Sequence, residues 1–501
     1  MNPVDKFLNN LTMYRLVVYV LGIYVALSVM FAFMGRLSSS PTALMVSLGL
    51  ILGPAYLVDR GLGRIFRVPT NRESALITSL IIFLIVQPAD SVATGLALVL
   101  AGAASSASKF LLAWNGKHIF NPAALAAALL SLTGLQAATW WIGSSAFWPF
   151  TALLGLMVVR KVRRFPLVIT FAIVSAVFQT LLFLHGHQDL GASAKHAAFA
   201  SPIIFLGTIM LTEPATMPPR RGWQMLFGAL VAILYIGAWQ IGPLEIYPEV
   251  ALLIGNIFAY LVSPKFRVRL ELMEIQKVSE HIYNYVFKPD RRFNFLPGQY
   301  MEWTLAGVPY DSRGNRRTFT IASSPTEPTV QLGMKFYEPA SMYKAAFQQL
   351  QAGDIVYASQ LAGNFTLQGN EQKKLAFVAG GIGITPFRSM LTYLSDKKQS
   401  ADIVLLYEVS DPREFAYVRE LQEAKSAGVR VIPIVTNPHY RTPKAVNAPM
   451  TAERLSQLVP DYAERLFYIS GPNSMVDAHK HYLRQLGVYD HRIRTDHFSG
   501  Y

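Results

Sequence analysis

The stretch KLAFVAGGIGITPF, residues 374–387, decides the fold of the second half of this 501-residue chain. An apolar run of strand length ends in three glycines, Gly380, Gly381 and Gly383, and a helical stretch follows. Glycines allow the backbone to approach a pyrophosphate, and the N-terminus of the following helix favours its negative charge. The stretch predicts a strand, a phosphate-binding turn and a helix, although many such turns only pack a strand against a helix.

Further strands follow this turn at regular spacing. The runs ADIVLLYEV, VRVIPIVT and RLFYISG alternate with helical stretches. Such βα repeats form a parallel sheet that binds ligands at the carboxyl ends of its strands. We therefore expect an α/β nucleotide-binding domain over residues 371–501, joined to what precedes it by the linker LQGNEQKK, residues 367–374.

The segment before this domain, residues 265–370, has the short alternating runs of an antiparallel β-barrel, such as YNYVFKP and VQLGMKFY. Its stretch RRTFTIASSP (316–325) places Arg317 and Phe319 on one face of a strand and Thr320 on the other. Arginine suits a diphosphate, an aromatic ring suits a planar cofactor, and a hydroxyl suits the nitrogen edge of a flavin. Alone, the stretch could equally be a surface cation beside core packing.

Five motifs in order make residues 266–501 resemble the ferredoxin–NADP reductase superfamily. They are FLPGQY (295–300), RRTFTIASSP, AGGIGITPF, YISGPNSMV (468–476) and TDHFSGY (495–501). The resemblance implies FAD held by the barrel, a nicotinamide nucleotide held by the sheet, and hydride transfer between them. It therefore implies an NAD(P)H-dependent, FAD-containing oxidoreductase.

The resemblance also implies roles for residues of the barrel. Arg317 would contact the flavin diphosphate, which Ser341, at the start of the helical stretch SMYKAAFQQL, would support. Phe319 and Thr320 would lie along the flavin.

In the sheet, the resemblance implies a nucleotide site and a nicotinamide site. The nucleotide would be bound by Gly380, Gly381, Gly383, Thr385 and Pro386. Ser470, Gly471 and Pro472 would lie near the nicotinamide, with Ser470 where the family usually has cysteine. Phe498 or Tyr501 would shield the flavin ring. The catalytic candidates are Thr320, Ser470 and Tyr501.

The choice between NADPH and NADH stays open in the sequence. The second strand of the predicted sheet ends YEVSDPREF. There, Ser410 and Arg413 favour a 2′-phosphate, whereas Glu408 and Asp411 disfavour it.

The first half of the chain has a different composition. Residues 1–264 hold 16 of the 45 Lys and Arg and 8 of the 31 Asp and Glu, so the two halves carry formal charges of +8 and +6. The pI of about 9.7 does not require a nucleic-acid partner, since basic residues also mark the cytoplasmic loops of membrane proteins. The chain has no cysteine, which excludes disulfides, thiolate-held iron–sulfur clusters and a cysteine nucleophile within it.

Residues 1–264 are predicted to be an α-helical transmembrane domain in the lipid bilayer, because ten windows of roughly 20 mainly apolar residues, some short, can each be a span. The windows are 13–35, 42–59, 73–88, 91–112, 119–135, 139–158, 165–184, 198–211, 222–241 and 245–263. Basic residues gather after every second window, so the positive-inside tendency places both termini and the second half in the cytoplasm. No small-residue cleavage site follows the first window, which argues against a secretory signal.

Two stretches of this half contain polar residues beside prolines. LTEPATMPPRR (211–221) ends the eighth window, and it is either a plain helix terminus or a broken helix where Thr212, Glu213 and Thr216 meet a cofactor or a cation. HIFNPAALAAALL places Asn121 at the start of a helix. There it either caps the helix or leaves free N–H groups for a phosphate.

FNPAA and MLTEPAT make residues 13–263 resemble the membrane flavin subunits of Rnf complexes and of sodium-pumping NADH:quinone oxidoreductases. That family attaches FMN to a threonine in an extracytoplasmic SGAT-type loop. The nearest segment here is DLGASA (189–194), with Ser193 at the place of the threonine and Leu190 where a hydroxyl residue is expected. The resemblance implies electron transfer to a quinone or an extracytoplasmic flavoprotein, and it admits FMN at Ser193.

Three alternatives differ in what the membrane half does. A haem-bearing reductase of the NADPH oxidase type needs histidines within helices, and only His118 lies at the start of a window. A redox-linked ion transporter is supported by Glu213 and by Asp189 in an outer loop. A plain anchor for a soluble reductase is disfavoured because one span would suffice. No metal site is predicted.

Overall fold

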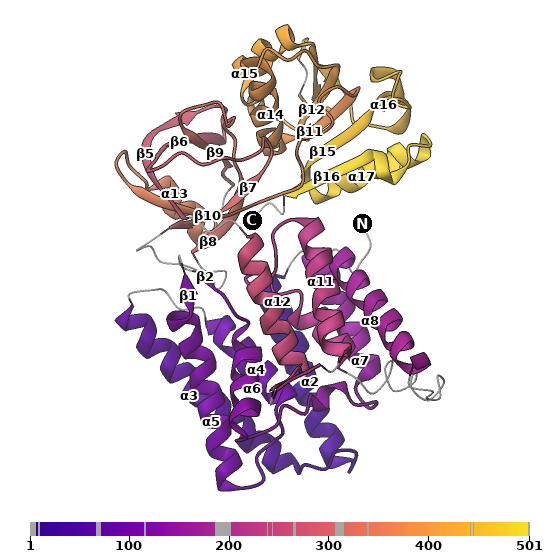
Figure 1. Cartoon of the computed structure of the whole chain (residues 1–501). Helices are drawn as coiled ribbons and strands as arrows, with labels where there is room; N and C mark the ends of the chain where they lie inside the picture. Colours follow the sequence, from indigo (N-terminus) through magenta and orange to yellow (C-terminus); the bar gives the residue numbers. More distant parts are fainter. Residues whose placement is uncertain are drawn as a thin grey trace. The chain divides into compact units, whose positions relative to one another are not determined.

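The protein forms two compact units in a computed structural model, Asn2–Lys265 and Phe266–Tyr501 (Figure 1). The residues that the structure describes are 7–8, 11–66, 72–114, 117–185, 202–237, 239–242, 244–263, 267–305, 315–337, 340–440, 442–443 and 445–498.

The first unit is helical, and four of its helices are long and apolar enough to cross a membrane. These are α2 (Met13–Phe33), α3 (Pro41–Ile65), α5 (Val92–Leu111) and α8 (Phe165–His185). At 1.5 Å per residue, 20 residues span roughly the 30 Å of a hydrocarbon core. The side chains of Thr12, Ser40 and Ser91 accept backbone N–H groups at the N-termini of α2, α3 and α5.

The other helices of this unit are shorter than the predicted windows. They are α4 (Arg72–Ile85), α6 (Pro122–Thr133), α7 (Trp148–Val162), α10 (Ile203–Phe205), α11 (Arg221–Ile236) and α12 (Pro248–Val262). The described residues therefore show four helices of spanning length rather than ten. Gly134, in the left-handed conformation at φ 69°, ends α6 early. The window 139–158 is interrupted because a 3₁₀ turn at Trp141–Gly143 precedes α7.

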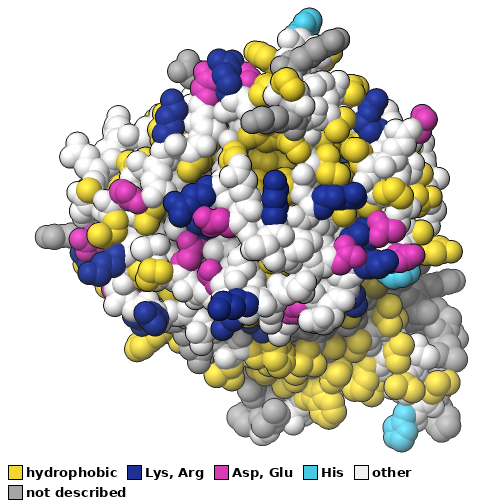
Figure 2. All heavy atoms as spheres, turned by 90° about the horizontal axis from the view of Figure 1, so that it is seen from above, with side chains coloured by type: hydrophobic (Ala, Val, Ile, Leu, Met, Phe, Trp, Pro, Cys, Tyr) yellow, Lys and Arg dark blue, Asp and Glu magenta, His cyan; other side chains and the backbone are white. Residues whose placement is uncertain are grey.

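The helices of the first unit have apolar side chains on their inward-facing and on their outward-facing sides. Inward-facing residues such as Leu21, Leu84 and Phe227 are at most 1% exposed. Outward-facing ones such as Leu57 and Val92 are 70% and 82% exposed. Figure 2 shows that one area of the surface is largely hydrophobic, whereas in another Lys and Arg are interspersed with Asp and Glu. An outer surface this apolar is expected where lipid or protein covers it.

The second unit begins with the predicted antiparallel barrel-like sheet. Its strands are β5 (Arg267–Lys277), β6 (Ile282–Pro289), β7 (Tyr300–Leu305), β8 (Arg316–Thr320), β9 (Val330–Lys335) and β10 (Ile355–Ala362), in the order β8-β7-β10-β5-β6-β9. Trp303, Phe287 and Phe347, the last from helix α13 (Met342–Gln348), lie in its core. Alternating burial along β7 matches the period-two pattern of its sequence.

The predicted parallel sheet follows. Its strands are β11 (Leu375–Gly380), β12 (Ile403–Val409), β13 (Val429–Val435), β14 (Val446–Asn447), β15 (Leu466–Pro472) and β16 (Ile493–Phe498), in the order β14-β13-β12-β11-β15-β16. Its helices are α14 (Thr385–Asp396), α15 (Val418–Glu423), α16 (Ala452–Leu458) and α17 (Asn473–Gln485). Because β12 lies on one side of β11 and β15 on the other, the strand order reverses at β11, where such sheets bind ligands.

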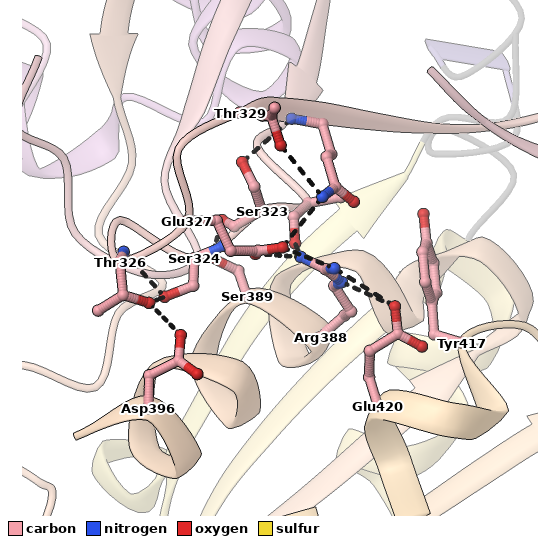
Figure 3. A network of polar contacts seen from close by, with 12 residues as sticks. Ser323, Ser324, Thr326, Glu327, Thr329, Arg388, Ser389, Asp396, Tyr417 and Glu420 are labelled. Carbon is pink, nitrogen blue, oxygen red and sulfur yellow. Dashed lines mark hydrogen bonds and ion pairs between the residues drawn. The ribbon is translucent and has the colours of Figure 1, made fainter. Parts of the chain in front are cut away.

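A polar network around the buried Arg388 joins the barrel to the sheet within this unit (Figure 3). Arg388 of α14 pairs with Glu327 through both terminal nitrogens and lies 3.3 Å from Glu420 of α15. It also donates to the carbonyl of Ala322 at 3.1 Å. Ala322 lies two residues after the end of β8. The helix that begins at the glycine turn therefore holds the loop that follows the predicted flavin strand.

Candidate functional site

The glycine turn lies at the carboxyl end of β11. Gly380 ends the strand, and Gly381 has a φ of +53° with no atom within 4 Å of the place where a Cβ would be. A Cβ at Gly383 would instead lie 2.3 Å from the carbonyl oxygen of Ser470. Gly383 is therefore required for close packing against β15, and Gly381 leaves open space in which a ligand can approach the backbone.

The first residues of α14 close the turn. Thr385 is buried, and its hydroxyl donates to the carbonyl of Ile382 at 3.1 Å. Pro386 occupies the first turn of the helix, where a missing N–H costs nothing. Both residues thus have structural roles that shape the turn.

Ser470 lies beside the turn, in register with Ala379 of β11. Its side chain is fully buried, and its Oγ has no hydrogen-bond partner among the described residues. Gly471 and Pro472 end the strand, and Pro472 is in register with Phe498 of β16. The structure therefore brings the YISGP motif and the start of the C-terminal motif to the same edge of the sheet as the glycine turn.

In the barrel, Arg317 and Phe319 lie on one face of β8, as predicted. The guanidinium carbon of Arg317 lies 5.1 Å from the ring centroid of Tyr343, and the Phe319 ring stacks on the same ring at 6.0 Å. Thr320 is buried and in register with Tyr300 of β7, so the RRTFT and FLPGQY motifs lie on adjacent strands.

Tyr343 belongs to this arrangement but was not among the sequence candidates. Its hydroxyl donates to the carbonyl of Trp303 at 3.0 Å, and burial raises its pKa well above the ordinary value. The sequence signal was its position two residues after Ser341. Ser341 itself caps α13, with its hydroxyl accepting the N–H of Lys344 at 3.4 Å.

In the helical unit, the structure brings together two candidates 92 positions apart in sequence. The side-chain amide of Asn121 donates to Glu213 Oε2 at 2.9 Å, and the hydroxyl of Thr216 donates to the same oxygen at 2.9 Å. His118 Nε2 lies 3.4 Å from Glu213 Oε1. Asn256 of α12 accepts the backbone N–H of Asn121 at 2.8 Å. The FNPAA and LTEPAT motifs thus form one polar cluster, the Glu213 cluster.

Two further contacts involve candidates of this region, and the second agrees with the capping role predicted for Asn121. The hydroxyl of Thr212 donates to the carbonyl of Thr208 at 2.8 Å in its own helical segment, so it does not bond to Glu213. Asn121 Oδ1 accepts the N–H groups of Ala123 and Ala124, at 3.1 and 3.0 Å. Those N–H groups are the ones a phosphate at this helix terminus would need, and the cap already satisfies them.

For three sequence candidates the structure describes no side chain. Ser193 and Tyr501 fall outside the described residues, and Phe498 is described only by its backbone. Within the described residues, no group of three or more His, Asp and Glu side chains is placed to hold a metal ion.

Comparison with known proteins agrees with this geometry. Residues 377–481 match the family model described as the oxidoreductase NAD-binding domain. The phenol hydroxylase P5 protein of Acinetobacter pittii is 28% identical over 240 residues, which cover 45% of this chain and 64% of that protein. The glycine betaine monooxygenase reductase subunit of Pseudomonas aeruginosa is 27% identical over 41% of this chain and 57% of its own length.

The second unit is similar to NAD(P)H-dependent, FAD-containing oxidoreductases. A flavohemoprotein of Oceanobacillus iheyensis is 23% identical over 44% of this chain and 57% of that protein. Among solved structures, the FAD/NAD-binding domain of a nitric oxide dioxygenase from Vibrio cholerae has a TM-score of 0.42 at 20% identity, over 46% of this chain and 98% of that one. The chain spans about three fifths of the length of the first relatives it matches.

The residues of this module fit a nicotinamide nucleotide and a flavin. The open backbone at Gly381 suits a pyrophosphate, and the buried, unpartnered hydroxyl of Ser470 needs a polar partner that a carboxamide can supply. On the barrel, Arg317 and Phe319 present a cation and a ring on one face.

Proposed function

We propose that this chain is a membrane-bound oxidoreductase that passes electrons from cytoplasmic NAD(P)H through FAD into the helical unit. The final acceptor would be a quinone or an extracytoplasmic flavin. The observation that carries the proposal is the Glu213 cluster. A reductase module shares its chain with an apolar helical unit in which Asn121 and Glu213 meet at 2.9 Å. Polar groups that converge inside such a unit mark a functional site more often than not.

In the reductase module, the residues would hold the ligands as follows. Arg317 and Ser341 bind the flavin diphosphate, and Phe319 and Thr320 lie along the flavin ring. FAD, when bound, supplies the ability to accept a hydride and to release single electrons. Phe498 or Tyr501 covers the ring.

On the sheet side, the glycine turn would receive the pyrophosphate of the nucleotide. The segment involved comprises Gly380, Gly381, Gly383, Thr385 and Pro386. Ser470 donates its hydroxyl proton to the nicotinamide carboxamide and thereby fixes the ring orientation, while Gly471 and Pro472 shape the adjoining edge. Because Ser470 is fully buried, this contact would be made away from water.

For the helical unit we propose a multi-pass arrangement of about ten spans with cytoplasmic termini. Four helices of spanning length and highly exposed side chains such as Val92 support it. The shorter helices would cross in part, as broken helices do when protein covers their ends. The Glu213 cluster lies at such an interruption, because a π-helical turn at Leu206–Met210 precedes it.

An FMN in the helical unit belongs to the same proposal. Ser193 is the candidate attachment residue, and it lies outside the described residues. A flavin inventory of the detergent-purified chain tests the assignment: FMN that stays on the denatured chain and disappears in Ser193→Ala supports it. Recovery of FAD alone would leave a quinone as the acceptor and refute covalent FMN.

A second candidate, a redox-linked ion transporter, is favoured by Glu249 of α12. This acid is 0% exposed, and its two oxygens accept the indole N–H of Trp140 at 2.8 Å and the hydroxyl of Ser131 at 3.1 Å. These donors are neutral. A buried acid in a membrane helix is a candidate for proton or cation exchange.

The two candidates are separated in vesicles that contain the purified chain. NAD(P)H oxidation coupled to quinone reduction, with no change in internal pH or sodium, supports electron transfer alone. Ion movement that depends on NAD(P)H and disappears in Glu249→Gln supports the transporter. Glu245→Gln is the matched control, because Glu245 is exposed and bonds to Tyr247 instead.

A further inference from the structure

An acid borders the glycine turn on the side opposite Ser470. Glu408 is the last residue but one of β12, and it is in register with Gly380. Its side chain is only 7% exposed. Glu408 therefore lies at the carboxyl edge of the sheet, beside the strand at which the strand order reverses.

A histidine holds this acid in place. His479 of α17 is 2% exposed, and its Nε2 lies 2.7 Å from Glu408 Oε1, within ion-pair distance although the angle is not that of a hydrogen bond. Its other ring nitrogen, Nδ1, lies 3.0 Å from the carbonyl oxygen of Met475. Since both nitrogens face oxygen acceptors, the ring is best matched as an imidazolium beside a carboxylate.

One oxygen of Glu408 remains available. Oε1 is fully buried against His479, whereas Oε2 is not fully buried and makes no hydrogen bond to the described residues. A carboxylate only accepts hydrogen bonds, so it suits the hydroxyls of a ribose. The same charge repels a phosphate.

The neighbouring cation is already neutralised. Arg413, in the segment after β12, donates from Nε to Asp411 at 3.0 and 3.1 Å and from Nη1 to Glu280 at 3.2 Å. Arg413 holds the pKa of Asp411 below its ordinary value, so Asp411 stays ionised at neutral pH. The arginine that could have met a 2′-phosphate is therefore occupied by two carboxylates.

We propose that Glu408, oriented by His479, accepts the hydroxyls of the adenine ribose and selects NADH over NADPH. In dinucleotide-binding sheets an acid beyond the glycine turn takes the 2′-hydroxyl, and a 2′-phosphate in its place meets a fixed negative charge. The inference rests on the proposed use of NAD(P)H and adds the choice between the two nucleotides.

The test is the ratio of kcat/KM for NADH to that for NADPH, measured on the full-length chain in detergent with ferricyanide as acceptor. The wild type is expected to prefer NADH by about 100-fold. Glu408→Gln should raise KM for NADH and reduce the preference to below about tenfold, with kcat little changed. Glu464→Gln is the matched control. Glu464 lies at the amino ends of the strands, away from the glycine turn, and pairs with Lys374 at 2.5 Å.

Two further variants separate selection from stability. His479→Gln should raise KM for NADH while the preference for NADH remains, because the carboxylate is still present but less well oriented. If Glu408→Gln fails to fold, the double variant Glu408→Gln with His479→Gln replaces the ion pair by two neutral amides and should show the same reduced preference.

The outcomes also distinguish this inference from the proposed function. Equal use of both nucleotides by the wild type, or a preference unchanged in Glu408→Gln, would overturn the role of Glu408 and leave the reductase intact. If neither nucleotide reduces the flavin, the proposed function itself is wrong.

Discussion

The two units differ in how they satisfy carboxylates that are partly or fully removed from solvent. In the reductase module, Glu327 and Glu420 meet the guanidinium of Arg388, and Glu408 meets His479. In the helical unit, Glu249 meets an indole and a hydroxyl. Paired charges hold two subdomains in one geometry. A carboxylate among neutral donors keeps its capacity to exchange a proton or a cation, so we assign an architectural role to Glu327 and Glu420 and an exchange role to Glu249.

The largest effect is expected at Arg388. Arg388→Ala leaves two carboxylates without their buried cation, and we expect the free energy of unfolding to fall by about 3–5 kcal/mol. Denaturant unfolding followed by flavin release measures it. Arg419→Ala on α15 removes the same charge from an 88% exposed side chain and should change nothing measurable. Equal effects of the two substitutions would show that the paired charges at Arg388 do not stabilise the module.

The next effect concerns the glycine turn. Gly383→Ala places a Cβ against the Ser470 carbonyl, so the turn must shift, and we expect flavin reduction by NADH to slow roughly 100-fold. At Gly380 the nearest atom to a new Cβ is the flexible end of Met475, at 2.5 Å. Gly380→Ala should therefore cost less. Stopped-flow absorbance measures both rates, and a larger loss in Gly380→Ala would contradict this account of the turn.

Glu213→Gln tests the helical side of the comparison. The Gln side chain has one accepting oxygen where Glu has two, so it cannot replace the carboxylate as the partner of Asn121, Thr216 and His118. We therefore expect acceptor reduction to fall by about tenfold or more. Ferricyanide reduction by the FAD module should be unchanged. A parallel loss of both activities would mean that Glu213 supports folding rather than transfer.

Ser470→Ala sharpens the contrast inside the reductase module. Because its Oγ has no partner among the described residues, removing it should leave the free energy of unfolding unchanged or slightly raised. Flavin reduction should slow by about tenfold if the hydroxyl orients the nicotinamide. A variant that loses stability but keeps its rate would refute the role in hydride transfer.

The smallest expected effect is a change in the free energy of unfolding with pH. Burial opposes the charge on His479, but Glu408 outweighs it, and the pKa of His479 is raised above its ordinary value of 6.5. The stabilisation is therefore fully present below pH 6.5 and is lost as pH rises through the higher folded-state pKa. Unfolding measured on both sides of that range should show the loss in the wild type but not in His479→Gln.

The reductase fold could be predicted from sequence because its signals are local. Glycines after an apolar strand and alternation in the barrel follow from backbone geometry, and both sheets have the expected form. The side chains that pair with one another across this fold could not be predicted from the sequence. Arg388 gave no sequence signal, since its carboxylates lie 61 and 32 positions away. His479 is likewise 71 positions from Glu408, and only folding shows that they meet.

The helical unit was predicted less well. Hydropathy detects long spans such as α2, but it cannot detect where caps and turns shorten a helix, as Gly134 does at α6. The polar motifs were recognised singly, and the bond between Asn121 and Glu213 was not foreseen. Residues with short polar side chains next to proline mark the ends of helices. Helix ends that are far apart in the sequence can lie together in the fold.

The most direct test of the central claim is a two-step stopped-flow experiment under anaerobic conditions on the detergent-purified chain. NADH is mixed first, and a short-chain quinone second. The account predicts flavin reduction in both wild type and Glu213→Gln, followed by quinone-dependent reoxidation that is fast in the wild type and at least about tenfold slower in the variant. Equal reoxidation in the two proteins would contradict electron transfer through the Glu213 cluster.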